Sequence, residues 1–305
     1  MADFMTRART WLAGVWRRPW VRFGLAGAIV AVLAFAWNVR FGPPPRVGYG
    51  PICEPTDAGC KPYDFARLEH ELPLTDAEIA KITPANIKHA SQEQVDQIYA
   101  RLSAGPIPDG AFDGDLFFAR GDDGGTRLAE ILGAPLLGTA ADAKIDRIEH
   151  LGRFLWKGKV FYRDEQLLRN RIEDVDGLAR LLGIDTSALM TMQDGVRDAW
   201  LLFPARLHCG QSLLDGRRES IVIDYAFTDA LPGYVANPDA LAGRDGLAVR
   251  DEIRMVRPGF YLGRAYLRRI FALNFTLVSA DAARAAESSS APPAEDCFAG
   301  MQARE

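Results

Sequence analysis

An apolar stretch near the N-terminus constrains this chain of 305 residues more than any other feature. Residues 23–39 read FGLAGAIVAVLAFAWNV, in which Asn38 is the one clearly polar side chain. A helix of this length spans about 25 Å, close to a hydrocarbon core of about 30 Å. Trp20 and Trp37 lie near its ends, where interfacial aromatic residues are common. The pattern predicts a transmembrane helix, and the Arg-rich arm before it disfavours the alternative of a buried core helix.

The charges around this segment predict its orientation. Residues 1–22 contain five arginines, and the positive-inside rule places such an arm in the cytoplasm. We therefore predict a single-pass inner-membrane protein with its N-terminus cytoplasmic and its C-terminal domain periplasmic. Ala34-Phe35-Ala36 also matches a signal-peptidase site, so cleavage after Ala36 stays open. The long arm and the bulky Trp37 favour an uncleaved anchor.

The remainder of the chain is acidic. Residues 1–40 carry six arginines and one aspartate, whereas the whole chain has a net charge of −4. Nucleic-acid binding requires a basic face that neutralises phosphates. We expect no nucleic-acid partner.

All four cysteines follow the apolar segment, where an oxidising compartment lets disulfides persist. They are Cys53, Cys60, Cys209 and Cys297. A Cys53–Cys60 bond would close a small loop and leave Cys209 and Cys297 to each other, but three connectivities are possible. A metal site is the weaker alternative, because the sequence has no CxxC and no histidine near the first two cysteines. We predict no metal and no cofactor.

The rest of the chain predicts an α+β protein. Thr75 and Ser91 each begin a capping box, which predicts two short helices. Strand patterns at 199–209, 219–227, 247–256, 259–267 and 270–278 alternate with tight turns, which is typical of an antiparallel sheet or small barrel. Helical patterns at 173–183 and 187–196 predict helical insertions. The predicted segments are a cytoplasmic arm (1–22), a transmembrane helix (23–39), a stiff Pro/Gly-rich linker (40–63), a helical cap (64–104), a β-rich domain (105–279) and a flexible tail (280–305).

Four motifs in order carry a resemblance to a known group of sequences. They are GPIPDG-x-F-x-G-x-L (105–116), WKGKVF (156–161), SIVIDYAFT (220–228) and RDEIRMVRPGFYLGRAY (250–266). Together they resemble uncharacterised bacterial envelope proteins with an (I/V)DY strand and a DE(I/L)RxVxPGxYLG hairpin, which are lipocalin-like. The resemblance covers about residues 100–278 and implies a small barrel with a cavity for an apolar ligand. The segments 164–196 and 229–246 are additions that would lengthen loops around the barrel mouth.

The candidate site residues lie on the predicted strands. Alternation along 247–256 places Val249, Asp251 and Ile253 on one face, so Asp251 is an acid among apolar neighbours, able to exchange a proton. Pairing with an arginine is the alternative role. Aromatic side chains here can line a pocket or simply pack in a core. The predicted ligand-binding residues are Trp156, Asp224, Tyr225, Asp251, Tyr261 and Tyr266. Lys157 and Lys159 flank Gly158, and we expect them to be solvated on either side of a turn.

Three functions are compatible with these features. The first is a membrane-anchored periplasmic binding module for an apolar or amphipathic small molecule, such as a lipid. The second is an accessory or assembly subunit of a membrane complex, docked through the small residues Gly24, Ala28 and Ala31. The third is an enzyme that uses Asp224 or Asp251. The motifs G-x-S-x-G, HExxH and the P-loop do not occur, so we favour a protein that is not an enzyme and assign no catalytic residue.

Overall fold

The computed structural model describes residues 42–52, 63–119, 156–173, 175, 179, 183–194, 197–289 and 295–298. The predicted arm, transmembrane helix and cleavage site, together with Cys53 and Cys60, lie outside these residues. Within the described part of the chain, no helix is long and apolar enough to cross a membrane. The chain divides into Met1–Pro44 and Pro45–Glu305, and the second unit contains every element described below.

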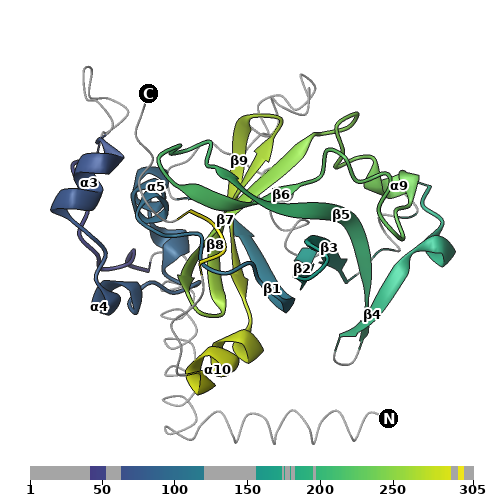
Figure 1. Cartoon of the computed structure of the whole chain (residues 1–305), viewed down its shortest axis with the longest axis horizontal. Coiled ribbons are helices and arrows are strands. Elements are labelled where there is room, and N and C mark those ends of the chain that lie inside the picture. Colours follow the sequence, from purple (N-terminus) through teal and green to yellow (C-terminus); the bar gives the residue numbers. More distant parts are fainter. Residues whose placement is uncertain are drawn as a thin grey trace, which may run out of the picture. The chain divides into compact units, whose positions relative to one another are not determined.

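Eight antiparallel strands form a closed barrel, which confirms the predicted α+β class (Figure 1). Around the barrel the order is β3-β2-β1-β9-β8-β7-β6-β5, and β5 returns to pair with β3. A ninth strand, β4, pairs with β5. The bounds are β1 Gly110–Phe117, β2 Trp156–Tyr162, β3 Leu167–Ile172, β4 Met190–Asp194, β5 Arg197–Gln211, β6 Glu219–Asp224, β7 Val249–Arg257, β8 Phe260–Leu267 and β9 Ile270–Val278.

The long strand β5 closes the barrel. Its 15 residues pair with β4 and β3 in the first half and with β6 in the second. The pairing with β3 has an irregular register around Phe203, whose φ of 50° is unusual for a non-glycine residue. The backbone amide of Phe203 donates to Asp239 Oδ1 (2.7 Å), and its carbonyl accepts from Asn170 Nδ2 (3.1 Å). The backbone N–H and C=O of Phe203, which the bulge removes from the regular strand pairing, therefore both have hydrogen-bond partners.

A second bulge lies at Gly158 in β2, where the register with β3 shifts and φ is 134°. Trp156 and Lys159 would face opposite sides of a regular strand, because an odd number of positions separates them. The extra residue of the bulge lets both line the barrel interior. Lys157 instead pairs with Glu173 and is about one-third exposed. The expectation of two solvated lysines beside a turn was wrong for Lys159, because Gly158 forms a bulge within a strand.

One end of the barrel interior is a packed apolar core. The rings of Phe112 and Phe161 meet edge to face with centroids 5.5 Å apart, and Tyr261 packs against Phe112 at 5.8 Å. Ile253 and Leu277 are fully buried in the same cluster. These rings therefore pack in the barrel interior, and Phe112 and Tyr261 also border a second cavity of about 630 Å³.

Short helices cover part of the outer barrel face. They are α3 (Phe65–Glu71), α4 (Asp76–Ile79), the 3-10 turn η1 (Ile87–His89) and α5 (Gln92–Ala100), and in Figure 1 α3, α4 and α5 gather on the left of the strands. Both expected capping boxes are formed, at Thr75 and Ser91. The buried face of α5 packs with Val256, Phe260 and Leu262 of β7 and β8.

The segment 164–196, predicted as a helical insertion, contains two strands, and most of the helix predicted at 173–183 lies outside the described residues. The stretch 164–196 includes β3 and β4, so the helix predicted at 187–196 was wrong from Met190 onward. Both strands gain a partner in β5, and such long-range pairing outweighs local propensity. The helices that the structure describes in the later loops are the short η2 (Thr186–Ala188) and α9 (Ala236–Asp239).

The linker and the tail are more ordered than their composition indicated. In the linker, the amides of Gly48 and Gly50 donate to the side chains of Glu78 (2.8 Å) and Gln97 (2.9 Å) of the helical cap. The tail begins with helix α10 (Ala280–Ser288), which Ser279 caps and whose alanines favour a helix.

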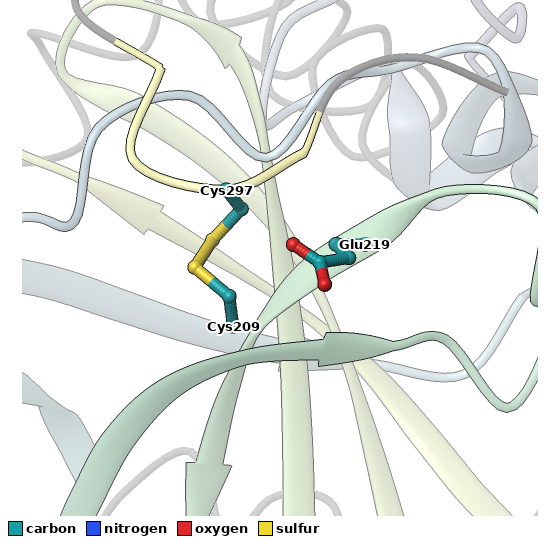
Figure 2. Close-up of side chains that lie close together, drawn as sticks. All are labelled: Cys209, Glu219 and Cys297. Atoms are coloured by element: carbon teal, nitrogen blue, oxygen red, sulfur yellow. A yellow bond between two sulfur atoms is a disulfide. The ribbon is translucent and has the colours of Figure 1, made fainter. Parts of the chain in front are cut away.

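A disulfide joins the tail to the barrel. Cys297 is bonded to Cys209 of β5, in one of the pairings that the sequence allowed (Figure 2). Glu219 lies beside this bond and accepts from the backbone amide of Phe298 (2.8 Å). Asp296 accepts from the guanidinium of Arg163 (2.6 Å). Although Cys209, Glu219 and Cys297 are close enough to hold a metal ion, both sulfur atoms are used in the disulfide.

Gly158 provides a test of the β2 bulge. A Cβ at this position would lie 2.0 Å from the carbonyl oxygen of Phe112, so Gly158→Ala should lower the free energy of unfolding by about 3 kcal/mol or more. Gly110 also has a positive φ (80°) but no atom within 4 Å of its Cβ position. Gly110→Ala should therefore cost only about 1 kcal/mol. Urea denaturation of the intact protein measures both, and equal losses would contradict the steric explanation.

The disulfide provides a second test, because it closes a loop across a sequence separation of 88 residues. Replacing both Cys209 and Cys297 by alanine should lower the free energy of unfolding by about 2 to 4 kcal/mol. Each single replacement should cost nearly as much as the double, since either one breaks the same bond. Additive losses in chemical denaturation would show that the two cysteines do not act as a pair.

Candidate ligand-binding cavity

A cavity of about 290 Å³ occupies the barrel end at which β2 and β7 begin. Its wall is mainly apolar and combines strand residues with the loop between β6 and β7. The apolar lining residues are Leu116, Trp156, Ile172, Phe203, Leu241, Ala242, Leu247, Val249, Ala265, Leu273 and Phe275. The cavity has the apolar wall that small-molecule sites usually show.

Four polar side chains form a connected group in this wall: Lys159, Asn170, Tyr225 and Asp251. Lys159 Nζ donates to Tyr225 Oη (2.7 Å), Asn170 Oδ1 (2.8 Å) and Asp251 Oδ2 (2.9 Å). The Tyr225 hydroxyl in turn donates to Asp251 Oδ2 (3.2 Å). Each of the three ammonium hydrogens of Lys159 therefore has an acceptor.

The barrel topology explains why these residues meet. Lys159 lies on β2 and Asp251 on β7, and in the closed order each strand is four positions from the other in both directions. The two strands are therefore opposite each other, and their side chains reach across the lumen. An eight-stranded barrel is narrow enough for such a contact. The ion pair therefore lies in the lumen, in the wall of the cavity.

Burial sets the electrostatics of the pair. The side chains of Lys159 and Asp251 are only 3% and 6% exposed. Loss of solvent lowers the pKa of Lys159, and the nearby Asp251 carboxylate opposes this effect. Burial, and then the charge of Asp251, raise the pKa of Tyr225 well above its usual range. Tyr225 is therefore a protonated phenol that can donate to the carboxylate.

Aromatic rings complete the surroundings of the lysine. Its Nζ lies 5.4 Å from the centre of the Trp156 ring and 5.5 Å from that of Phe275. These two rings pack edge to face with their centroids 5.8 Å apart. The indole nitrogen of Trp156 donates to Asn170 Oδ1 (2.9 Å), which fixes the ring. Rings at this distance favour a positive charge on Nζ.

Three of the six residues singled out from the sequence line this cavity: Trp156, Tyr225 and Asp251. The alternation predicted for β7 is confirmed, since Val249 and Asp251 face the lumen. The partner of Asp251 is a lysine on the opposite strand and not the arginine that we considered.

The other three predicted residues, Asp224, Tyr261 and Tyr266, do not line this cavity. Asp224 pairs in register with Arg250, on the face opposite to Asp251, and accepts from the backbone amide of Ala226 (2.8 Å). It therefore makes no acid pair with Asp251. Tyr261 belongs to the packed core, borders the second cavity and donates to the carbonyl of Pro106 (2.6 Å). Tyr266 accepts from Arg264 Nε (3.0 Å).

Sequence reasoning missed Lys159 and Asn170. A glycine inside a β-prone stretch is the usual sign of a bulge, and it could have indicated that Lys159 turns inward. Asn170 lies in the stretch 164–196, which we treated as a helical insertion. No local signal shows that this segment pairs with β2 and β5.

Comparison with known proteins gives a distant likeness and no family. No family model matches the chain, and no curated protein matches it. The chain is similar to a solved structure, a protein from Thermomonospora curvata, with 16% sequence identity over 62% of this chain and 88% of that one. The TM-score is 0.32, which carries no functional argument. The antiparallel barrel implied by the sequence resemblance is present, and no family is assigned.

The ion pair can be tested with a double-mutant cycle. Lys159→Met leaves the buried Asp251 carboxylate without its cation and should lower the free energy of unfolding by about 3 to 5 kcal/mol. Asp251→Leu should cost a similar amount for the same reason. The double variant Lys159→Met/Asp251→Leu should lose much less than the sum, because it leaves no unpaired charge. Strictly additive losses in urea denaturation would contradict a direct pair.

Proposed function

We propose that the barrel binds a small, neutral and largely apolar molecule whose single polar group meets the group formed by Lys159, Asn170, Tyr225 and Asp251. The observation that carries the proposal is the apolar cavity of about 290 Å³ with this polar group in its wall. A few placed polar groups in an apolar wall orient a ligand and make it specific. The lipocalin-like resemblance points to the same kind of function.

The charge of the ligand follows from the ion pair. An anionic ligand would bring a second negative charge to Lys159, which Asp251 already neutralises. A cationic ligand would face the ammonium of Lys159 at close range. In a water-poor site either excess charge is unfavourable. A neutral ligand with a hydroxyl or carbonyl oxygen avoids this cost.

The size of the ligand follows from the volume. The cavity has a volume of about 290 Å³. This is at the lower limit of ligand pockets, which begin near 300 Å³. We therefore propose a ligand the size of a medium-length alkyl chain or a single aromatic unit.

We further propose that the barrel stands in the periplasm, anchored in the inner membrane through residues 23–39. The apolar N-terminal segment and its arginines support this location. The Cys209–Cys297 disulfide also fits an oxidising compartment. An apolar ligand would then be available from the adjacent bilayer.

Octanol, octanoate and octylamine test the proposal, because they share one alkyl chain and differ in charge. With the intact protein in nanodiscs, octanol at a hundred times its dissociation constant should raise the free energy of unfolding by about 2.7 kcal/mol. The two charged compounds should have much smaller effects, read by thermal unfolding.

The matched controls are two alanine-to-phenylalanine variants. Ala265→Phe fills the cavity and should abolish the octanol effect, whereas Ala280→Phe places the same ring at an exposed position of α10 and should not. Equal stabilisation by octanoate would refute the charge argument. Stabilisation that survives Ala265→Phe would place the ligand outside this cavity.

A further inference from the structure

The polar group in the cavity contains a nucleophile that simple ligand binding does not require. Lys159 is buried and, among the described residues that line the cavity, it is the one amine. A hydroxyl or amide could orient a neutral ligand without the cost of burying a charge. A lysine beside an acid, in an apolar pocket, is the arrangement that allows covalent capture of a carbonyl group.

We propose that the ligand is an aldehyde or ketone and that Lys159 Nζ condenses with it to form an imine inside the barrel. This inference rests on the proposed function, since the carbonyl compound must first enter the cavity. It assigns the substrate class and the bonding atom. The observations behind it are the reach of Lys159 into the cavity and its contacts with Asp251, Tyr225 and two aromatic rings.

The contact with Asp251 provides the neutral amine. Lys159 Nζ lies 2.9 Å from Asp251 Oδ2, so a proton can pass directly between them. Burial lowers the pKa of Lys159, and Asp251 Oδ2 is the hydrogen-bond acceptor that can take the released proton. The free electron pair on Nζ can then attack a carbonyl carbon.

Imine formation needs no reactant other than Lys159, Asp251 and the carbonyl compound. Nζ forms a bond to the carbonyl carbon as the C=O π electrons move to oxygen, and a proton moves from nitrogen to that oxygen to give a carbinolamine. Asp251 returns its proton to the hydroxyl group, which leaves as water as the C=N bond forms. An ammonium and a carbonyl compound thus become an iminium and water, with no net gain or loss of protons and no oxidation.

The surroundings of Lys159 suit the product. The iminium keeps the positive charge of the original ammonium, so Asp251 remains its counter-ion. Trp156 and Phe275, whose ring centres lie 5.4 and 5.5 Å from Nζ, favour a cation in this position. The Tyr225 phenol, which donates to Asp251 (3.2 Å), keeps the carboxylate in place. The rest of the carbonyl compound would occupy the apolar part of the cavity.

Reductive trapping tests the proposal directly. The intact protein in nanodiscs is incubated with octanal and sodium cyanoborohydride, which converts an imine into a stable secondary amine. Intact-mass and peptide mass spectrometry then locate the adduct. We expect one adduct, on Lys159, formed faster than at exposed lysines such as Lys81. Adducts spread over exposed lysines with none on Lys159 would overturn the proposal.

Three variants keep the test valid if the fold is sensitive to substitution. Lys159→Arg retains a cation for Asp251 but cannot form an imine, so it should remove the adduct. Lys157→Arg, two positions away and about one-third exposed, should leave the adduct on Lys159 unchanged. Asp251→Asn removes the proton carrier and should slow trapping by about a hundredfold. A trapping rate unchanged by Asp251→Asn would overturn the proton-transfer step.

A comparison of octanol with octanal distinguishes the binding hypothesis from the imine hypothesis. If octanol stabilises the protein through the cavity but octanal leaves no adduct on Lys159, the binding function stands and the imine is refuted. If neither compound interacts, the proposed function itself fails.

Discussion

The structure depends on the closure of one sheet, and strand β5 makes that closure. β5 is long enough to pair with β3 on one side and with β6 on the other, and a bulge at Phe203 interrupts the pairing with β3. Without this pairing the sheet would have two open edges and its inner face would meet water. With it, β2 and β7 lie opposite each other, so Lys159 can reach Asp251. The cavity and its polar group are therefore consequences of closure.

The buried side chains of Arg254 and Lys159 have different roles because their hydrogen-bond partners differ. Arg254 lies on the outer face of β7 and donates to the carbonyls of Tyr99 (3.1 Å) and Ala100 (3.3 Å), where helix α5 ends. It also donates to Ser220 Oγ (3.0 Å). These contacts dock the helical cap onto the barrel and satisfy the end of a helix. Lys159 pairs with an acid next to open space, so its contacts can change when a ligand enters.

The two ends of the barrel differ in what occupies the interior. At one end, Phe112, Phe161 and Tyr261 pack in the interior, and the tail segment is held close by. Glu295 of this segment accepts from Ser103 Oγ (2.7 Å) and the Gly105 amide (3.0 Å), and the disulfide at Cys297 secures it covalently. At the other end the interior is a cavity, bordered by the loop between β6 and β7.

The local features of the fold could be predicted from the sequence, because they depend on neighbouring residues. The capping boxes at Thr75 and Ser91 and the alternation along β7 that turns Asp251 inward are of this kind. Trp156 and Tyr225 could likewise be chosen as aromatic residues on β-prone stretches.

Tertiary structure decided what depends on distant contacts. No local residue pattern near Met190 indicates a strand. This segment is a strand because it pairs with β5. Lys159 faces the lumen because Gly158 forms a bulge against β3, and a Cβ at Gly158 would collide with the Phe112 carbonyl of β1. Asn170 joins the site through the pairing of β3 with β2 and β5. The sequence alone determined which residues could form strands and turns. Barrel closure decided which of them meet, since strands far apart in the chain become opposite walls of one lumen.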